Sequence, residues 1–221
     1  MRYIAAIDYQ HLDNGVFLTT LARSLSQQQG QSDVRSILIH SDSAYTERII
    51  QTGVMRDEAT VRSVKDLNNR LVALFADQGV STVGINPFQR KFITRNQDGL
   101  TFDHSFFETL PHQSVLLLST LVYDEESKKP VVIDLPMLAQ FLFNELQADQ
   151  LFIFSKSDES EIFTKKNDVN DLQWDAMDES FRESQIPEEF ANLNHPVQLI
   201  TARDFNQIPN LGQAVSIGQK T

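Results

Sequence analysis

The sequence predicts an α/β protein, a three-layer α/β/α sandwich with a mainly parallel central sheet. Short, continuous apolar runs such as residues 36–40 are typical of parallel strands that are covered on both faces. They alternate with longer stretches whose apolar residues recur every three or four positions, as on one side of a helix. Such alternation favours parallel strands joined by helical crossovers. A length of 221 residues, 41% of them hydrophobic, suits one such domain.

The first half of the chain alternates regularly between the two kinds of element. We predict strands over residues 3–7, 36–40 and 80–85, and helices over residues 15–28 and 57–78 between them. This order makes two successive strand–helix–strand units, which are expected to place their three strands in one parallel sheet.

The predicted helix over residues 57–78 has the clearest pattern. Its apolar residues fall on one stripe, as expected for a helix that packs on a core. They are Val61, Val64, Leu67, Leu71, Leu74 and Phe75. Asp57 is expected to cap the start of this helix, and Gly79 ends it.

The second half continues the alternation after a hairpin region over residues 88–110. Asp98-Gly99 is a turn signal between two short strands of this region. Asp134 is expected to cap a helix that has Pro136 in its first turn. The further predicted elements are strands over 114–122 and 131–133, a helix over 135–146, strands over 151–154 and 197–201, and a short helix and a last strand within 204–217.

The acidic residues are concentrated in the second half. Residues 1–110 have a net charge of −1, whereas residues 111–221 have a net charge of −10. Nucleic acid and anionic membranes are therefore disfavoured as partners. Residues 158–189 alone have a net charge of −8, and we predict an exposed loop there with one acidic helix. This segment is either solvated surface that aids solubility or a docking site for a basic partner.

The residue inventory excludes several kinds of site. Because the chain has no cysteine, it has no disulfide, thiolate nucleophile or cysteine metal ligand. Its five histidines are not spaced as metal ligands, and we predict no metal site. A GxSxG motif is absent, so a serine hydrolase has little support. No apolar run is long enough to cross a membrane or to form a signal-peptide core, and we expect a cytoplasmic protein.

Residues 53–88, GVMRDEATVRSVKDLNNRLVALFADQGVSTVGINPF, resemble the amino acid kinase family, which includes acetylglutamate, aspartate, uridylate and isopentenyl phosphate kinases. A long helix with an Asn and a Leu-Val pair, then Gly-Val and a strand, is that family's pattern. Other family blocks occur in the right order over nearly the whole chain. The resemblance implies one domain over 1–221, with a substrate-side lobe over 1–150 and a shortened, acidic nucleotide-side lobe over 151–221. It also implies a homodimer.

The first two phosphate-binding segments of this family are altered in the chain. The family opens with a strand that ends in a lysine and a Gly-Gly-Ser turn. Here Ala5 or Ala6 stands at the lysine position, and no glycine follows. The family's His-Gly-Gly-Gly loop keeps its histidine as His40, but the glycines become Ser41, Asp42 and Ser43.

The middle motifs are altered as well. Glu47 stands where the isopentenyl phosphate kinases have a second, catalytic histidine. Ser119 and Thr120 replace the family's Gly-Asp pair, whereas the aspartate that follows after a spacer is kept as Asp124.

The last motifs lose a catalytic acid and a glycine. Pro136 stands at the place of the family's catalytic aspartate, with Asp134 two residues earlier. Glu161 takes the place of a glycine in the nucleotide loop. The residues that keep the general shape of that loop are Ser157, Asp158, Phe163 and Thr164.

These departures predict that ATP-dependent phosphotransfer has been lost. Catalysis of this reaction depends on positioning and on positive charge around the transferred group. Asp42 puts a carboxylate there instead, and two like charges ~4 Å apart repel by about 4 kcal/mol at an effective dielectric constant of 20. One lost electrostatic group, such as the first-strand lysine, typically lowers the rate by ~10²–10³-fold.

The sequence therefore favours a non-catalytic protein that binds a small anionic or carboxylate ligand or acts as an oligomeric partner, with no cofactor. The residues predicted to contact the ligand are Arg56, His40, Ser41, Ser43 and Asn68. For Arg56 and His40 the alternatives are a surface arginine and a structural histidine. The rival hypothesis is a divergent kinase that uses ATP and Mg²⁺ at a relocated site, with Asp124 or Asp134 as the catalytic acid and Arg56 or Lys156 as the cation.

Overall fold

Eight strands form the main sheet of the protein. The computed structural model describes residues 1–28, 34–157, 171–173, 178–190, 197–208 and 215–218. In the order β10-β12-β11-β9-β1-β2-β6-β3, all neighbours are parallel except β11 and β12. The bounds are β1 Arg2–Ile7, β2 Arg35–His40, β3 Thr82–Ile85, β6 Val115–Ser119, β9 Gln150–Phe154, β10 Asp171–Gln173, β11 Val197–Ile200 and β12 Val215–Gly218. The predicted, mainly parallel sheet is confirmed.

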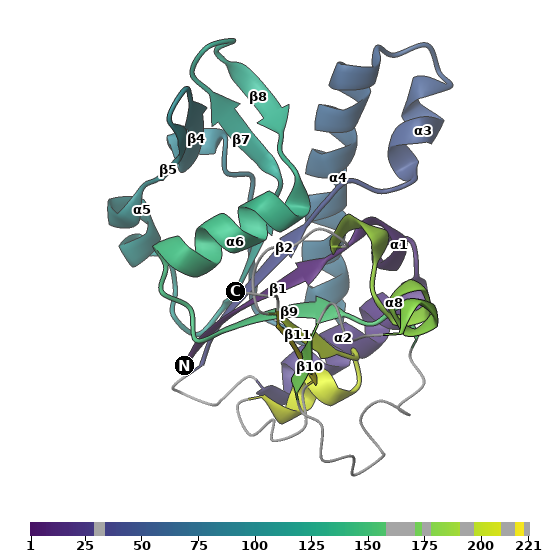
Figure 1. Ribbon diagram of the computed structural model, residues 1–221. Coiled ribbons are helices and arrows are strands. Elements are labelled where there is room, and N and C mark those ends of the chain that lie inside the picture. The colour runs from purple at the N-terminus through teal and green to yellow at the C-terminus, as the bar shows by residue number, and fades with distance from the viewer. Residues whose placement is uncertain (29–33, 158–170, 174–177, 191–196, 209–214, 219–221) are drawn as a thin grey trace.

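A second, four-stranded sheet projects from one side of the molecule (Figure 1). Its order is β5-β4-β7-β8, with β4 and β7 parallel and the other pairs antiparallel. The bounds are β4 Ile93–Asn96, β5 Gly99–Phe102, β7 Leu121–Asp124 and β8 Lys129–Val132. The hairpin predicted around Asp98-Gly99 is the β4–β5 hairpin of this sheet.

The single strand predicted over residues 114–122 is wrong. The chain forms β6 in the main sheet, passes through Thr120, and continues as β7 in the small sheet. The N–H of Thr120 donates to the carbonyl of His40, 3.2 Å away, and its carbonyl accepts the N–H of Ile133 at 3.0 Å. Both strands are buried, so the apolar run continues through the change of sheet and hides it from the sequence pattern.

Helices cover both faces of the main sheet and complete the predicted three-layer sandwich (Figure 1). Tyr3 and Ala5 of β1 share a core with the apolar sides of α2 and α4, whereas Ile4 and Ala6 face the core under α6. This is the alternation expected of a strand that is buried on both sides. The helices are α1 Tyr9–Leu12, α2 Gly15–Gln28, α3 Tyr45–Ile50, α4 Arg56–Asp77, α5 His104–Thr109, α6 Leu135–Glu145 and α8 Glu179–Gln185, with 3-10 turns η1 Gln89–Lys91, η3 Glu188–Phe190 and η4 Asp204–Gln207.

The helix caps are predicted correctly in one case of two. Asp134 caps α6, and its carboxylate accepts the N–H of Met137 at 3.4 Å. The cap predicted for α4 is wrong, because Met55 occupies that position without a side-chain bond and Asp57 lies inside the first turn. An aspartate in the first turn still favours the helix through the macrodipole. No helix among the described residues is long and apolar enough to cross a membrane.

Helix α4 lies very close to β3, because residue 84 is a glycine. A Cβ atom at Gly84 would lie 2.5 Å from Oδ1 of Asn68 and 2.7 Å from Cγ2 of Val72. Both distances are shorter than real carbon contacts. The close approach brings the buried side of α4, with Asn68, onto the edge strand β3 and its neighbour β6.

Candidate functional site

The carboxyl ends of β1, β2, β6 and β9 meet at one edge of the main sheet, because these neighbouring strands are parallel. Open α/β sheets bind their ligands at this edge. The loops after β1 and β2, where the sequence predicts the altered phosphate-binding segments, both lie here. We call these two loops, together with the side chains that bind them, the carboxyl edge.

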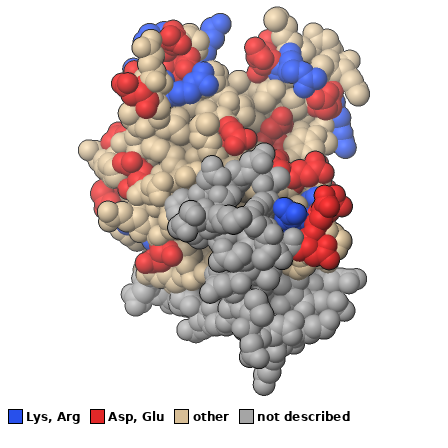
Figure 2. All heavy atoms as spheres, in the orientation of Figure 1, with Lys and Arg blue, Asp and Glu red and all other residues tan. Residues whose placement is uncertain are grey.

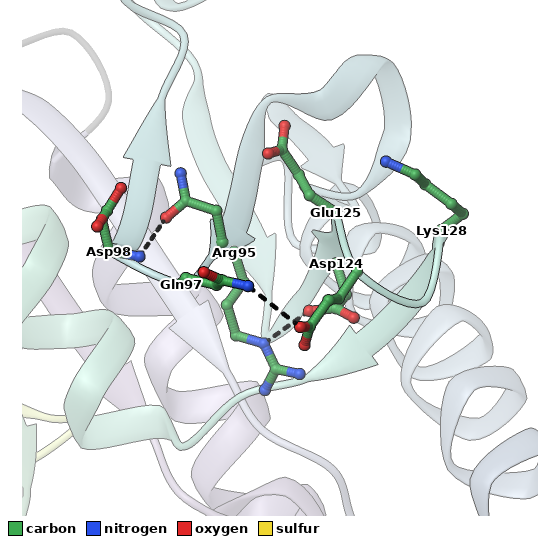
Figure 3. Close-up of a pocket in the computed structure, with 8 residues that line it drawn as sticks. Arg95, Gln97, Asp98, Asp124, Glu125 and Lys128 are labelled. Atoms are coloured by element: carbon green, nitrogen blue, oxygen red, sulfur yellow. Dashed lines mark hydrogen bonds and ion pairs between the residues drawn. The ribbon is translucent and has the colours of Figure 1, made fainter.

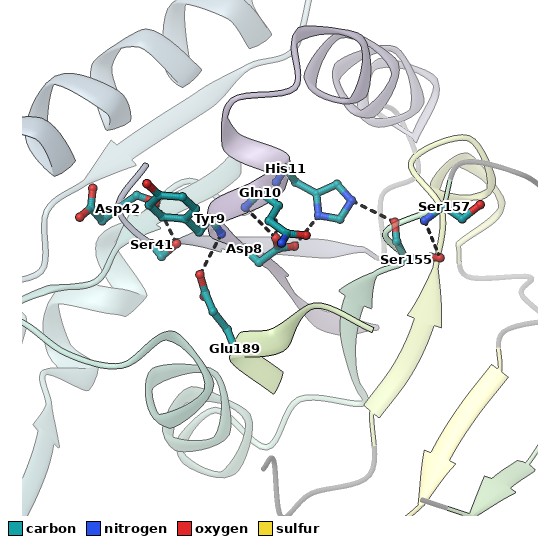
Figure 4. A network of polar contacts seen from close by, with 9 residues as sticks. All are labelled: Asp8, Tyr9, Gln10, His11, Ser41, Asp42, Ser155, Ser157 and Glu189. Atoms are coloured by element: carbon teal, nitrogen blue, oxygen red, sulfur yellow. Dashed lines mark hydrogen bonds and ion pairs between the residues drawn. The ribbon is translucent and has the colours of Figure 1, made fainter. Parts of the chain in front are cut away.

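The backbone N–H groups after β1 are bound by carboxylates of the chain itself (Figure 4). Asp8 follows the strand and accepts the N–H of Gln10 at 2.9 Å and the N–H of His11 at 3.4 Å. The N–H of Tyr9 donates to Oε1 of Glu189, which comes from η3, 180 residues away in the sequence. Three consecutive N–H groups thus have carboxylate acceptors.

The loop after β2 is bound in the same way. The N–H of Ser43 donates to the carboxylate of Asp42, which also accepts the hydroxyl of Thr46. The N–H of Ala44 donates to Oδ2 of Asp13 at 2.9 Å. Two aspartates therefore occupy the N–H groups that the glycine-rich loop of the resembled family would offer to phosphate.

The carboxyl edge is a negatively charged environment. Burial raises the pKa of Glu189 to about 7, against the effect of its bond from Tyr9. Three neighbouring carboxylates raise it further, those of Asp8, Asp134 and Asp42. Burial also raises the pKa of Asp42. Burial is the main cause of both shifts, and the neighbouring carboxylates that add to them also oppose a bound anion.

His11 joins the loop after β1 to the end of β9. It is not among the residues that the sequence predicts for the site. Its Nδ1 contacts the carboxylate of Asp8, and its Nε2 lies 2.9 Å from the carbonyl oxygen of Ser155. Both ring nitrogens face oxygen atoms, so the ring donates to both when it carries two protons. The side chain is buried against Phe17. The only sign of this contact in the sequence is that Asp8 and His11 are three residues apart.

His40 and Asn68, two predicted ligand residues, are buried and bonded to each other. Nδ1 of His40 lies 2.8 Å from the carbonyl oxygen of Ser41, and Nε2 accepts from the Asn68 amide at 3.0 Å. The same amide donates to the carbonyl of Leu117 at 3.1 Å. Burial lowers the pKa of His40 to about 4, so the ring is neutral at pH 7. These bonds tie β2, α4 and β6 together; contact with a ligand stays a prediction.

The remaining predicted ligand residues are one exposed arginine and two buried serines. Arg56 is exposed at the start of α4, where its Nη1 is 2.9 Å from Oε1 of Glu47 on α3. Ser41 donates its hydroxyl to the carbonyl of Asp42 at 3.1 Å, and the hydroxyl oxygen of Ser43 accepts the N–H of Tyr45 at 3.3 Å. The structure places these side chains near the loop after β2 but bonds each of them within the chain.

Comparisons with known proteins find likeness in structure alone. No sequence family model matches the chain, and no curated protein matches it. An isopentenyl phosphate kinase structure is 14% identical, with a TM-score of 0.63 over 99% of both chains. An aspartate kinase from Synechocystis is 8% identical with a TM-score of 0.67, over 99% of this chain and 40% of the other. An N-acetylglutamate synthase from Neisseria gonorrhoeae is 18% identical with a TM-score of 0.64, over 100% and 60%.

The chain has an amino acid kinase-like fold. At these identities the likeness shows the fold alone, and it agrees with the resemblance seen in the sequence. This chain is about as long as the isopentenyl phosphate kinase, but it spans only part of the aspartate kinase and the synthase.

Within this amino acid kinase-like fold, the two acids of the rival kinase hypothesis lie at different places. Asp124 is at the far end of β7, where Oδ1 accepts from Nε of Arg95 at 2.9 Å and Oδ2 accepts the N–H of Ser127 at 2.9 Å (Figure 3). Bonds from Ser127 and then Arg95 lower the pKa of Asp124 to about 2. Asp134 lies beyond the other end of β8, so the two are separated by more than the ~10 Å length of these strands.

The nucleotide-loop residues are described only in part. The N–H of Ser157 donates to Oγ of Ser155 at 3.2 Å, just after β9. Lys156, the alternative cation, donates to the carbonyl of Glu183 at 3.1 Å, and Oγ of Ser155 donates to Oε1 of Gln185 at 2.7 Å. These bonds hold α8, the predicted acidic helix, at the end of β9. The other predicted loop residues, Asp158, Phe163 and Thr164, lie outside the described residues.

Acidic side chains at the carboxyl edge do not form a metal site. Among the residues that the structure describes, no group of three or more His, Asp or Glu side chains is arranged to hold a metal ion. At this edge the carboxylates bind backbone N–H groups and His11 instead.

Proposed function

We propose that this chain is an amino acid kinase-fold protein that has lost ATP-dependent phosphotransfer and has kept a binding role. One observation carries the proposal. Five N–H groups of the two loops at the carboxyl edge, those of residues 9–11, 43 and 44, donate to carboxylates of the chain, those of Asp8, Asp13, Asp42 and Glu189.

A phosphate that bound at this edge would have to break these hydrogen bonds between N–H groups and carboxylates. Backbone N–H groups at the ends of strands and starts of helices bind phosphate because they offer donors and positive partial charge. Here five of these donors already have a carboxylate acceptor, and a phosphate that took their place would displace carboxylates that then lie beside it. The cations predicted for the site are engaged elsewhere, Arg56 with Glu47 and Lys156 with the carbonyl of Glu183.

Phosphotransfer is tested by incubating the purified protein with labelled ATP, Mg²⁺ and a panel of small acceptors. We expect no labelled product above the protein-free background, and no heat when ATP and Mg²⁺ are titrated into the protein in a calorimeter. ATP-dependent phosphorylation that is lost in Asp134→Asn or Asp124→Asn would refute the proposal and establish the rival kinase.

We propose two alternatives for the binding role. Either Arg56 contacts a small anionic or carboxylate ligand, or the chain binds a second copy of itself. Arg56 is the exposed member of the predicted ligand set, and its pair with Glu47 is open to solvent. Sedimentation over a range of protein concentrations distinguishes monomer from homodimer.

Two further expectations stay predictions, a cytoplasmic location and the docking of a basic partner on residues 158–189. Docking of a basic partner requires binding that weakens as the salt concentration rises.

A further inference from the structure

A groove runs between the start of α4 and β8. It has a volume of about 790 Å³, within the range of roughly 300–1,000 Å³ that is usual for small-molecule sites. None of the predicted ligand residues lines it. Figure 2 shows the molecule hollowed here, between the projection that carries the β7–β8 hairpin and the one that carries α3 and α4, with charged side chains on both sides.

The two walls of the groove carry opposite charges. Asp57 and Glu58, in the first turn of α4, are exposed carboxylates on one wall. Arg95 of β4 and Lys129 of β8 are on the other wall. Arg95 uses Nε for Asp124, and its side chain remains 46% exposed. Among the described residues no side-chain hydrogen bond or ion pair engages Asp57, Glu58 or Lys129, in contrast to the carboxyl edge.

The surface between these charges is largely apolar. Val61 of α4 and Val131 of β8 are only partly buried, and Met55 at the lip of the groove is 77% exposed. The flexible side chain of Met55 can adapt to the shape of a molecule bound beside it.

The outer edge of β8 suits a small molecule better than an added peptide strand. The N–H of Ile133 donates to Thr120 on the β7 side, so by alternation the N–H of Val132 faces away from β7. The next outward position toward the hairpin turn is Pro130, which has no N–H to offer a further strand.

We propose that this groove binds a small amphipathic zwitterion, such as an apolar amino acid. Its ammonium group lies at Asp57 and Glu58, its carboxylate at Lys129 and Arg95, and its apolar body over Val61. The walls are complementary to the two charges of such a molecule, and the floor is complementary to its side chain. This site is distinct from the one proposed at Arg56, and the inference does not depend on the loss of phosphotransfer.

The test compares L-leucine with two analogues that each lack one charge, 4-methylpentanoate without the ammonium and 3-methylbutylamine without the carboxylate. Calorimetry or NMR titration of the full chain should show saturable binding of leucine, with each analogue weaker by about fivefold. Lys129→Gln should weaken leucine by about fivefold and leave 3-methylbutylamine unchanged. Glu58→Gln should weaken leucine and leave 4-methylpentanoate unchanged. Lys128→Gln, the matched control outside the groove, should alter none of them.

Two results would overturn the inference. One is the absence of saturable binding of leucine and of phenylalanine at millimolar concentration, with the protein shown to be folded by circular dichroism. The other is leucine binding that Lys129→Gln and Glu58→Gln leave unchanged. The phosphotransfer assay is independent of both, so failure of this inference and failure of the proposed loss of activity are distinguishable.

Discussion

The carboxyl edge of the main sheet and the groove between α4 and β8 are both rich in charged groups, but they use them differently. At the carboxyl edge, carboxylates bind N–H groups of the same chain, and burial raises the pKa of Asp42 and of Glu189. In the groove, carboxylates and cations face each other across open space, and no side-chain contact engages Asp57, Glu58 or Lys129 among the described residues. The difference teaches that two charged regions of one fold can differ in whether their groups are free to bond a ligand, and that the edge where open α/β sheets bind ligands is here the one whose carboxylates are bonded within the chain.

The largest loss of stability is expected from removing a side chain that anchors the carboxyl edge to the core. Asn68→Ala removes the partner of His40 Nε2 and of the Leu117 carbonyl, both buried, and should lower the free energy of unfolding by about 3 kcal/mol. Chemical denaturation measures it. Asn69→Ala, one residue on and exposed, is the control and should change stability by less than about 0.5 kcal/mol. Equal effects of the two variants would mean that this network does not hold the edge.

A smaller loss is expected from removing an edge carboxylate. Asp8→Ala leaves two N–H groups and the His11 ring without their acceptor and should cost about 2 kcal/mol, against almost nothing for exposed Asp77→Ala. Inorganic phosphate should not restore the melting temperature of Asp8→Ala. Restoration by phosphate would show that the vacated N–H groups still bind an oxyanion, and the contrast between edge and groove would weaken.

The pH dependence of stability sharpens the contrast further. Burial raises the pKa of Glu189 from 4.5 to about 7, so between these pH values the folded state holds a proton that the unfolded state has released. Its contribution to stability therefore falls as pH rises through this window. Glu189→Gln removes the fall, so the variant should gain stability relative to the wild type from pH 4.5 to pH 7.

Two comparisons separate this effect from others in the same range. Glu188→Gln, the exposed neighbour, should show a constant difference from the wild type at all pH values. His40 acts in the opposite direction, because its pKa is lowered from 6.5 to about 4 and its contribution is lost as pH falls through that window. It is present in all three proteins and cancels in the differences. A Glu189→Gln difference that does not change with pH would contradict the assignment.

The smallest effect is expected in the groove. Met55 lines the groove and is exposed, so Met55→Ala should change the free energy of unfolding by less than about 1 kcal/mol. A loss of several kcal/mol in thermal or chemical denaturation would show that the groove is structural and not a surface kept for a ligand.

Much of the fold could be predicted, because its strands and helices follow local patterns. The continuous runs of β1, β2 and β9 and the stripe of α4 lie where the sequence predicts them. For the carboxyl edge, the sequence predicted that the phosphate-binding segments are altered, but it did not predict which side chains bind their N–H groups. Asp8 is near its N–H partners in the sequence, but Asp13 and Ala44 are 31 residues apart and Glu189 and Tyr9 are 180 apart. No local sequence pattern predicts contacts between residues so far apart. The groove could not be predicted for the same reason, because its walls come from segments distant in the sequence.

Thr120 has a mechanical consequence for the groove. Both legs of the β7–β8 hairpin are fastened to the main sheet at this residue, one through the bond of its N–H to His40 and the other through the bond of its carbonyl to Ile133. Ser119, next to it, donates its hydroxyl to Oδ1 of Asn86 at 2.8 Å. These bonds hold the base of the β8 wall to the main sheet. We therefore expect the groove to keep its width when a molecule binds, so that the thickness of that molecule decides whether it fits.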